Sequence, residues 1–267
     1  VVFAEGEEES VIRAAIAFRN AGYGTPVLVG REERINATVA SLGVRLPDGI
    51  EIHNARVSSQ NARYAEWLYV RKQRDGFLYR DCLRLVNNVR TALDAEGVMF
   101  GLTMMIARRS GTVLVADTAI HERPDAGTLA AIAIRSAATA RRLGLTPRVA
   151  FLSYSTFGNP PGDRGEKVRE AIRILDQRGV DFEYEGEMPP ELALDPEARA
   201  AYPFMRLTGH ANVLVMPAIH SAAISTRLVQ SLGGATVIGP LLVGLEKSVQ
   251  IVSLGASVSE IITAATF

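Results

Sequence analysis

The chain has 267 residues and a formal net charge of zero, with 29 lysines and arginines against 29 aspartates and glutamates. Hydrophobic residues make up 48% and charged residues 22%, the balance of a folded globular protein rather than a disordered chain. A neutral chain lacks the basic field that nucleic-acid and membrane-surface proteins need, so we expect neither kind of partner.

Cys82 is the single cysteine, which excludes an intramolecular disulfide and any zinc or iron–sulfur site built from several cysteines. The low cysteine content fits a reducing compartment, and we expect a cytoplasmic location. No apolar run is long enough to cross a bilayer, and no signal peptide is visible. The chain begins at Val1 inside a strand-like run and ends in a helix-like segment. We therefore interpret it as a piece of a longer protein.

Short apolar strands alternate with amphipathic helices along the chain. The strands are near-continuous runs of Val, Leu and Ile, a pattern typical of a parallel sheet covered by helices on both faces. We therefore predict an α/β fold. After the strand-like start, the first predicted elements are a helix over Glu7–Ala21, a strand over Val27–Val29, a helix over Ala55–Arg74, a strand over Thr112–Ala116, a helix over Ala126–Leu143 and a strand over Arg148–Leu152. They are followed by a helix over Lys167–Arg178, a strand over Asn212–Met216, a helix over Ala222–Leu232, strands over Thr236–Ile238 and Val249–Val252, and a helix over Ser257–Ala265.

Residues 153–167 form the strongest candidate site, because they follow a buried strand and open a helix. Ligands of open α/β sheets collect outside the carboxyl ends of the strands. Glycines let the backbone approach a ligand, hydroxyls donate hydrogen bonds, and a helix N-terminus favours an anion. The spacing of a Walker A loop is absent. We predict that this loop binds an anion or phosphate, with an ordinary turn-rich loop as the alternative. The candidate residues are Ser153, Ser155, Thr156, Asn159, Arg164 and Lys167.

A second polar segment, Asp117-Thr118-Ala119-Ile120-His121-Glu122, follows the predicted strand Thr112–Ala116. Its Asp, Thr and His side chains are of the types that polarise or position a substrate. A metal site from Asp117, His121 and Glu122 is conceivable on residue type, but a solvated loop is the favoured interpretation, and we expect no metal.

Other chemistry finds little support in the sequence. Ser153, Ser155 and Ser253 have no His–Asp pair at a recognisable spacing, so we expect no serine-hydrolase triad. No Gly-x-Gly-x-x-Gly motif is present, so we do not expect nicotinamide binding within this chain. Ser257 and Glu260 have the spacing of a helix-capping box, which is a structural feature.

Several segments together resemble the phosphate acetyl/butyryltransferase family. The resemblance extends over nearly the whole chain and rests on Ala4–Glu8, Asp117–Ala119, Ser153–Thr156, Gly186–Met188, Ala211–Pro217 and Ile238–Gly244. One branch is more similar still, the C-terminal phosphotransacetylase-like domain of bacterial hybrid NADP-dependent malic enzymes. The segments that point to this branch are Thr118–Glu122, Thr156–Pro160, Tyr202–Phe204 and His220–Ser225.

The resemblance implies a two-lobed, three-layer α/β/α fold of the isocitrate/isopropylmalate dehydrogenase-like, phosphotransacetylase type, with a cleft between the lobes. The first lobe would comprise residues 1–100 plus 241–267, and the second the insertion 101–240. Relatives have a few dozen further residues after Asn88, where this chain continues directly into Val89. The resemblance also implies a homodimer of this domain.

The resemblance implies that, in such malic enzymes, an N-terminal module converts malate to pyruvate with NADP and a divalent metal. The C-terminal domain serves oligomerisation and regulation by acetyl-CoA, and needs no cofactor of its own. Active transacetylases carry Asn-Asp-Leu-Ser-Arg-Gly where this chain has Gln250–Gly255, so Ile251 replaces the Asp and Leu254 the Arg. Thr118 replaces the usual cysteine.

These departures favour a regulatory domain that binds acetyl-CoA and has no catalytic residues. We expect acetyl-CoA to lie in the inter-lobe cleft, against the 153–167 loop, Asp117, Thr118, Ser253 and Leu254. The alternative is an active phosphate acetyltransferase, which converts acetyl-CoA and phosphate to acetyl phosphate and CoA. A pure oligomerisation domain remains a third interpretation.

Overall fold

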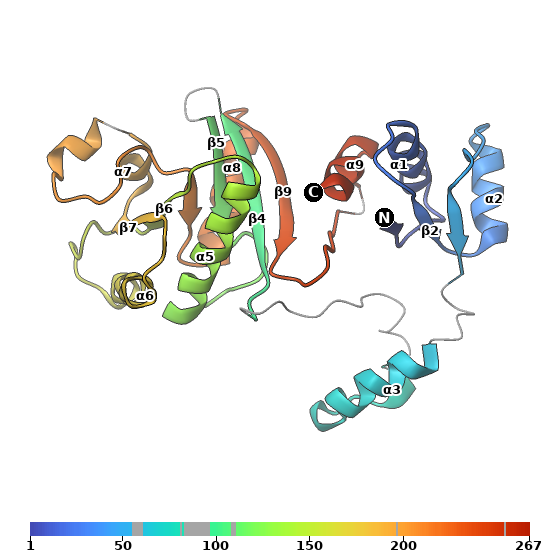
Figure 1. The fold of residues 1–267 in the computed structure, drawn as a ribbon, viewed down its shortest axis with the longest axis horizontal. Helices are drawn as coiled ribbons and strands as arrows, with labels where there is room; N and C mark the ends of the chain where they lie inside the picture. The colour runs from blue at the N-terminus through green and yellow to red at the C-terminus, as the bar shows by residue number, and fades with distance from the viewer. Residues whose placement is uncertain (55–60, 81, 83–96, 108–110, 196, 254) are drawn as a thin grey trace. The chain divides into compact units, whose positions relative to one another are not determined.

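The computed structural model describes residues 1–54, 61–80, 82, 97–107, 111–195, 197–253 and 255–267, with only the backbone of Asn61, Asp75 and Arg164. The chain divides into two units, Val1–Thr91 plus Gln250–Phe267, and Ala92–Val249. Each unit has its own sheet with helices packed on it (Figure 1). This architecture confirms the predicted two-lobed α/β class. The lobe boundary predicted at residue 241 falls inside strand β9, Thr236–Val243, which belongs to the second unit.

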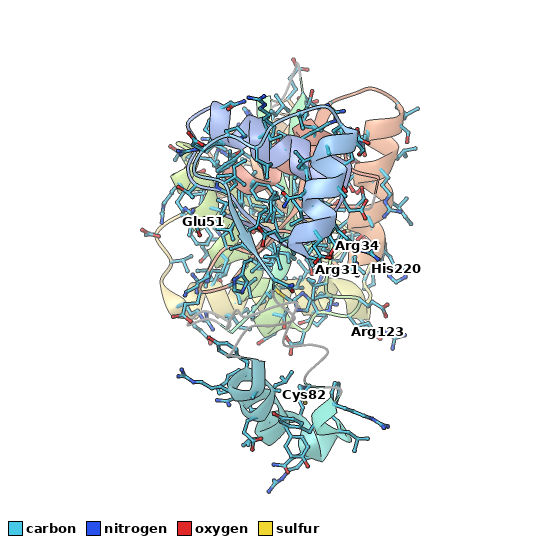
Figure 2. All side chains as sticks on the ribbon, turned by 90° about the vertical axis from the view of Figure 1, so that its right-hand side faces the viewer. Arg31, Arg34, Glu51, Cys82, Arg123 and His220 are labelled. Atoms are coloured by element: carbon cyan, nitrogen blue, oxygen red, sulfur yellow. The ribbon has the colours of Figure 1, made fainter. Side chains whose placement is uncertain are left out.

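The first unit is built on a parallel sheet in the order β1-β2-β3. Its core joins the sheet to the first and last helices through Phe3, Ile12, Phe18, Leu28 and Ile261. Cys82 is buried beside α3 (Figure 2). The elements of this unit are β1 (Val2–Phe3), α1 (Glu9–Asn20), β2 (Val27–Val29), α2 (Glu32–Ser41), β3 (Glu51–His53), α3 (Asn61–Lys72), a 3-10 turn (Gln73–Asp75) and α9 (Val258–Thr266).

An ion pair fixes the start of α2 in the first unit. Both carboxylate oxygens of Glu7 accept from the Arg31 guanidinium at 2.9 Å, and one also accepts from the Arg31 backbone N–H at 2.9 Å. Arg31 and Arg34 lie together at this end of the helix (Figure 2). The hydrogen bonds from Arg31 lower the pKa of Glu7 to about 2.

The second unit contains a six-stranded sheet in the order β7-β6-β8-β5-β4-β9. Strands β5 to β8 run parallel, and β4 runs antiparallel to both of its neighbours. The carboxyl ends of the four parallel strands therefore share one edge. The strands are β4 (Phe100–Ala107), β5 (Gly111–Ala116), β6 (Arg148–Leu152), β7 (Glu183–Met188), β8 (Val213–Val215) and β9.

Alternate residues of these strands pack into two layers, as expected for a sheet buried on both faces. On one face, Phe151 and Val215 pack with side chains of α5 (Ala126–Arg142) and α6 (Asp163–Arg178). On the other, Leu152 and Leu214 pack with α7 (Pro190–Leu194) and α8 (Ile219–Ser231). A 3-10 turn, Ala198–Ala201, follows α7.

The strand predicted at Val249–Val252 is wrong, because these residues have no regular secondary structure. Ile251 is 68% exposed and Val252 40% exposed, so the apolar run is not the interior of a sheet. It spans the division between the two units, where no described strand pairs with it. The first part of the helix predicted from Ala55 and the junction at Asn88–Val89 lie outside the described residues.

Candidate functional site

The polar loop after β6 folds into a tight turn at the carboxyl edge of the sheet. The Ser153 N–H donates to the Met188 carbonyl at 2.9 Å, which fastens the loop to the end of β7. Thr156 and Asn159 exchange backbone hydrogen bonds of 2.9 and 3.0 Å. Phe157 between them has a φ of 47°, an uncommon value for a residue with a side chain. The turn thus has a fixed shape rather than that of a loose, solvated loop.

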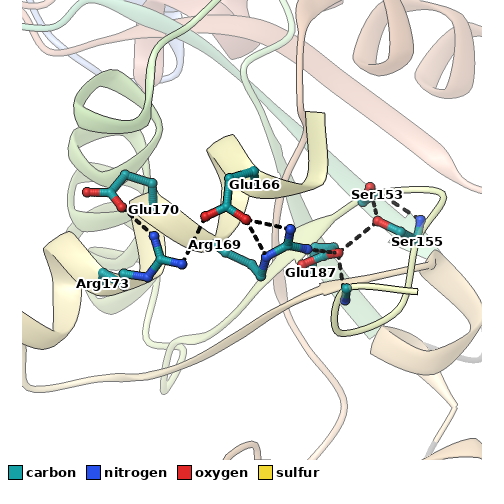
Figure 3. A network of polar contacts seen from close by, with 8 residues as sticks. Ser153, Ser155, Glu166, Arg169, Glu170, Arg173 and Glu187 are labelled. Atoms are coloured by element: carbon teal, nitrogen blue, oxygen red, sulfur yellow. Dashed lines mark hydrogen bonds and ion pairs between the residues drawn. The ribbon is translucent and has the colours of Figure 1, made fainter. Parts of the chain in front are cut away.

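The fully buried side chain of Glu187, at the end of β7, organises this loop (Figure 3). Its Oε1 atom accepts from Ser155 Oγ at 2.8 Å, from the Gly158 N–H at 2.9 Å and from Arg169 Nη1 at 2.8 Å. Gly165 permits this packing, because a Cβ there would lie 2.9 Å from Glu187 Oε1. One carboxylate therefore joins the loop, β7 and α6.

The network continues outward along α6 in alternating charges (Figure 3). Arg169 donates to Glu166 at 2.6 and 3.1 Å, and Arg173 donates to both Glu166 and Glu170. Hydrogen bonding to Glu166, with the Glu187 charge, raises the pKa of Arg169. The buried Oε2 of Glu187 has no hydrogen-bond partner among the described residues. Arg169 supplies the positive charge that this buried carboxylate requires.

A second buried carboxylate, Asp117, fixes the loop after β5. It accepts from the N–H groups of Gly101 and Ala119 at 2.8 Å and of His121 at 2.6 Å. The His121 ring contacts it as well, with Nδ1 2.7 Å from Oδ2. Thr118 is buried, with its hydroxyl 2.9 Å from that of Thr103. Among the described residues no third metal-ligating side chain joins Asp117 and His121.

The two loops lie on the same edge of the sheet. Strands β5 and β6 are separated only by β8, so their ends are about 10 Å apart at the usual strand spacing. Asp125, the N-cap of α5, accepts from the Thr128 N–H, which lowers its pKa, and the charges of His121 and Lys167 contribute to the same shift.

The predicted site residues fall into three groups. Ser153, Ser155, Thr156 and Asn159 lie together in the turn at the sheet edge, where Ser155 is buried and Asn159 exposed. Lys167 lies on α6, the helix that follows this turn. Asp117 and Thr118 lie buried beneath the neighbouring loop.

The third group has no established place at this edge. Ser253 is exposed in the other unit, so its part in the site stays a prediction. Leu254 and the Arg164 side chain lie outside the described residues.

No helix in the described part of the chain is long and apolar enough to span a membrane.

Sequence analysis missed the roles of Glu187 and Arg169. Glu187 lies in Gly186-Glu187-Met188, one of the segments that carry the family resemblance. A glutamate beside the last apolar residue of a strand is one signal that could have marked it, because such a side chain must find donors when buried.

These features define a two-lobed α/β protein with a polar site at the carboxyl edge of its larger sheet. The chain matches the phosphate acetyl/butaryl transferase family over residues 1–95 and 80–267, and it belongs to that family. It is 48% identical to the NADP-dependent malic enzyme of Rhizobium meliloti over 99% of this chain and 39% of that protein. It is 29% identical to the phosphate acetyltransferase of Staphylococcus aureus, over 98% of this chain and 90% of that protein.

The solved phosphotransacetylase of Streptococcus pyogenes has the same fold, with a TM-score of 0.88 and 27% identity over 100% of this chain and 91% of that one. The chain thus spans about two fifths of the malic enzymes it matches and most of the phosphotransacetylases. The resemblance inferred from sequence is confirmed at both levels.

The family match comes in two pieces that overlap at residues 80–95, the region of the Asn88–Val89 junction. The alignment with the Rhizobium protein covers 299 positions, more than the 267 residues of this chain. Both observations support the expectation that relatives have additional residues near this junction.

Proposed function

We propose that this chain is the C-terminal regulatory and oligomerisation domain of an NADP-dependent malic enzyme, and that it binds acetyl-CoA without acting on it. The identity of 48% with a protein more than twice as long supports a place within a larger chain. In the larger chain that we propose, an N-terminal module would carry out the oxidative decarboxylation of malate to pyruvate with NADP and a divalent metal. This chain forms the homodimer and senses acetyl-CoA.

The observation that carries the non-catalytic part of this proposal is the pair Ile251 and Leu254, where transacetylases are expected to have Asp and Arg. A positioned cation that stabilises developing charge lowers a reaction barrier by a few kcal/mol, and leucine supplies no such charge. The polar loop after β6 is nevertheless retained and tightly organised. A site that keeps its binding loop and loses its charged groups fits binding better than turnover.

The geometry of the sheet edge supports recognition of a CoA ester. Asn159 is exposed, and Ser153 and Thr156 are partly exposed, so their polar groups can bond the carbonyls of the pantetheine arm. Lys167 is the fifth residue of α6, close to the helix N-terminus, which favours phosphate. Ser155 acts indirectly, because its hydroxyl donates to Glu187.

The second candidate is an active phosphate acetyltransferase. It is favoured by the match to 90% of the Staphylococcus aureus phosphate acetyltransferase, a protein without room for a second large module. The third candidate is an oligomerisation domain. It differs from the first in predicting that the chain does not bind acetyl-CoA.

A transferase assay separates the first two candidates. We expect no acetyl transfer from acetyl phosphate to CoA above the uncatalysed rate, with a phosphate acetyltransferase as the positive control. Turnover in the usual enzyme range of about 1–10³ s⁻¹ would favour the transferase. The double variant Ile251→Asp/Leu254→Arg tests whether the two missing charges explain the lack of activity. Because it restores both charges, it should transfer acetyl groups faster than the wild type.

A further inference from the structure

We propose that His121 binds a phosphate group of the CoA ester through its Nε2 atom, while Asp117 holds the ring in place. This inference rests on the proposed function, and it adds a ligand-contacting residue at the sheet edge. It follows from how the ring is anchored, from what surrounds it, and from the chemistry left at its outer nitrogen.

The His121 ring is held from one side only. Asp117 Oδ2 lies 2.7 Å from Nδ1, and the same carboxylate accepts the His121 backbone N–H at 2.6 Å. Asp117 is almost fully buried, whereas 26% of the His121 side chain is exposed. The edge of the ring opposite Nδ1, which carries Nε2, is therefore the part turned away from the buried carboxylate. Within the described part of the chain, nothing is bonded to Nε2.

Asp117 has no capacity left for a ligand of its own. Besides the ring, it accepts from the backbone N–H groups of Gly101, Ala119, Ile120 and His121. These donors offset its negative charge, so the carboxylate orients the imidazole without strongly repelling an anion beyond it. Asp117 is accordingly a positioning residue, and His121 is the group that it presents.

The surroundings of His121 favour an anionic ligand. The charges of Lys167 and His121 both contribute to the lowered pKa of Asp125, the N-cap of α5. The His121 carbonyl accepts the N–H of Ile219, so α8 begins beside this loop, and His220 is its next residue. Arg123 follows two residues after His121. The N-terminus of α5 also lies nearby, capped by Asp125.

The remaining nitrogen has a defined role toward phosphate. When Nδ1 donates to a carboxylate, Nε2 of the protonated ring donates to an oxygen of the ligand. A phosphate monoester or diphosphate is the part of a CoA ester that accepts such a bond most strongly. The neutral side chains of the 153–159 turn then bind the thioester and pantetheine carbonyls.

Two substitutions separate ligand contact from structural support. His121→Asn places an amide nitrogen near the position of Nδ1, so it keeps a donor for Asp117 and removes Nε2. His121→Gln places its amide nitrogen near Nε2 and loses the short contact with Asp117. We expect His121→Asn to keep the melting temperature of the wild type and to bind acetyl-CoA and inorganic phosphate at least tenfold more weakly. We expect His121→Gln to melt at a lower temperature and to lose less affinity.

Calorimetric titration of the wild type and both variants, with acetyl-CoA and with inorganic phosphate, gives distinct outcomes. Wild-type affinity for acetyl-CoA in His121→Asn would overturn this inference and leave the proposed function intact. Phosphate binding that depends on His121 without acetyl-CoA binding would overturn the proposed function and keep the anion site. Binding of neither ligand to the wild type would overturn both. The ¹⁵N resonance of Nε2 in the wild type provides a test without mutation: it should shift on addition of phosphate, and an unchanged resonance counts against the contact.

Discussion

Arg169 on α6 donates to the fully buried carboxylate of Glu187 at 2.8 Å, and this contact ties the helix to the end of β7. The same carboxylate oxygen accepts from Ser155 and from the Gly158 backbone. The shape of the polar loop therefore depends on an ion pair whose acidic member has no access to water. Loss of Arg169 would leave Glu187 buried without a counter-charge.

We predict that Arg169→Met destabilises the second unit by about 3 kcal/mol, the usual cost of removing one partner of a buried ion pair. Arg173→Met is the matched control on the same helix, because Arg173 pairs with Glu166 and Glu170 at the surface. Exposed pairs contribute about 0–1 kcal/mol. Urea unfolding of both variants measures the difference. Equal losses of stability would show that Glu187 does not need Arg169.

We predict that Lys167→Met weakens acetyl-CoA binding about tenfold, because a cation close to the N-terminus of α6 is suited to a ligand phosphate. Arg178→Met, in the last turn of the same helix, removes the same charge far from the sheet edge and should bind as the wild type does. Calorimetric titrations compare the two. Equal affinities in both variants would place the phosphates of the ligand elsewhere.

Helix α8 leads to a prediction about assembly. Ile224, Leu228 and Leu232 follow one another at intervals of four residues and are 66%, 56% and 77% exposed, while Ala222 and Thr226 pack inward. An apolar stripe of this kind is costly to leave in water. We predict a homodimer and expect Leu228→Glu to shift it toward monomer. Leu143→Glu, at the end of α5, is the control. A monomeric wild type in light scattering at micromolar concentration would contradict the prediction.

The pKa of Glu7 gives the first unit a defined acid sensitivity. Hydrogen bonds from Arg31 lower this pKa from 4.5 to about 2 in the folded protein. The carboxylate therefore contributes stability above about pH 4.5, and the contribution disappears as the pH falls toward 2. We predict that Glu7→Gln is less stable than the wild type at pH 6 and that the difference narrows by pH 3. Denaturation midpoints at both values measure it, and a pH-independent difference would show that the Glu7 charge is not responsible.

The parallel strands with apolar sequences were the easiest part of the fold to predict. Strand β6 has the predicted bounds, Arg148–Leu152, and α5 ends within one residue of its prediction. Each element has a local pattern, an apolar run for the strand and an amphipathic stripe for the helix. The apolar residues of these patterns are the ones that the tertiary structure buries. The same rule failed at Val249–Val252, where an apolar run has no neighbouring strand to pair with.

Strand β7 shows what local patterns miss. Its sequence, Glu-Tyr-Glu-Gly-Glu-Met, is too polar to predict a buried strand, yet Glu185 and Glu187 are buried within it. The Arg206 N–H donates to Glu185 and the Arg169 side chain to Glu187, both from distant segments. The polar loop after β6 was predicted as a candidate site from its glycines, its hydroxyls and its position. The carboxylates that shape it depend on contacts that only the fold creates.

The most direct test of the account is calorimetric titration of acetyl-CoA into the protein in phosphate buffer, followed by analysis of the recovered ligand. The proposal that this chain binds acetyl-CoA without transferring its acetyl group predicts saturable binding and acetyl-CoA recovered unchanged. Conversion of the ligand to CoA and acetyl phosphate, or the absence of any binding heat up to millimolar acetyl-CoA, would contradict it.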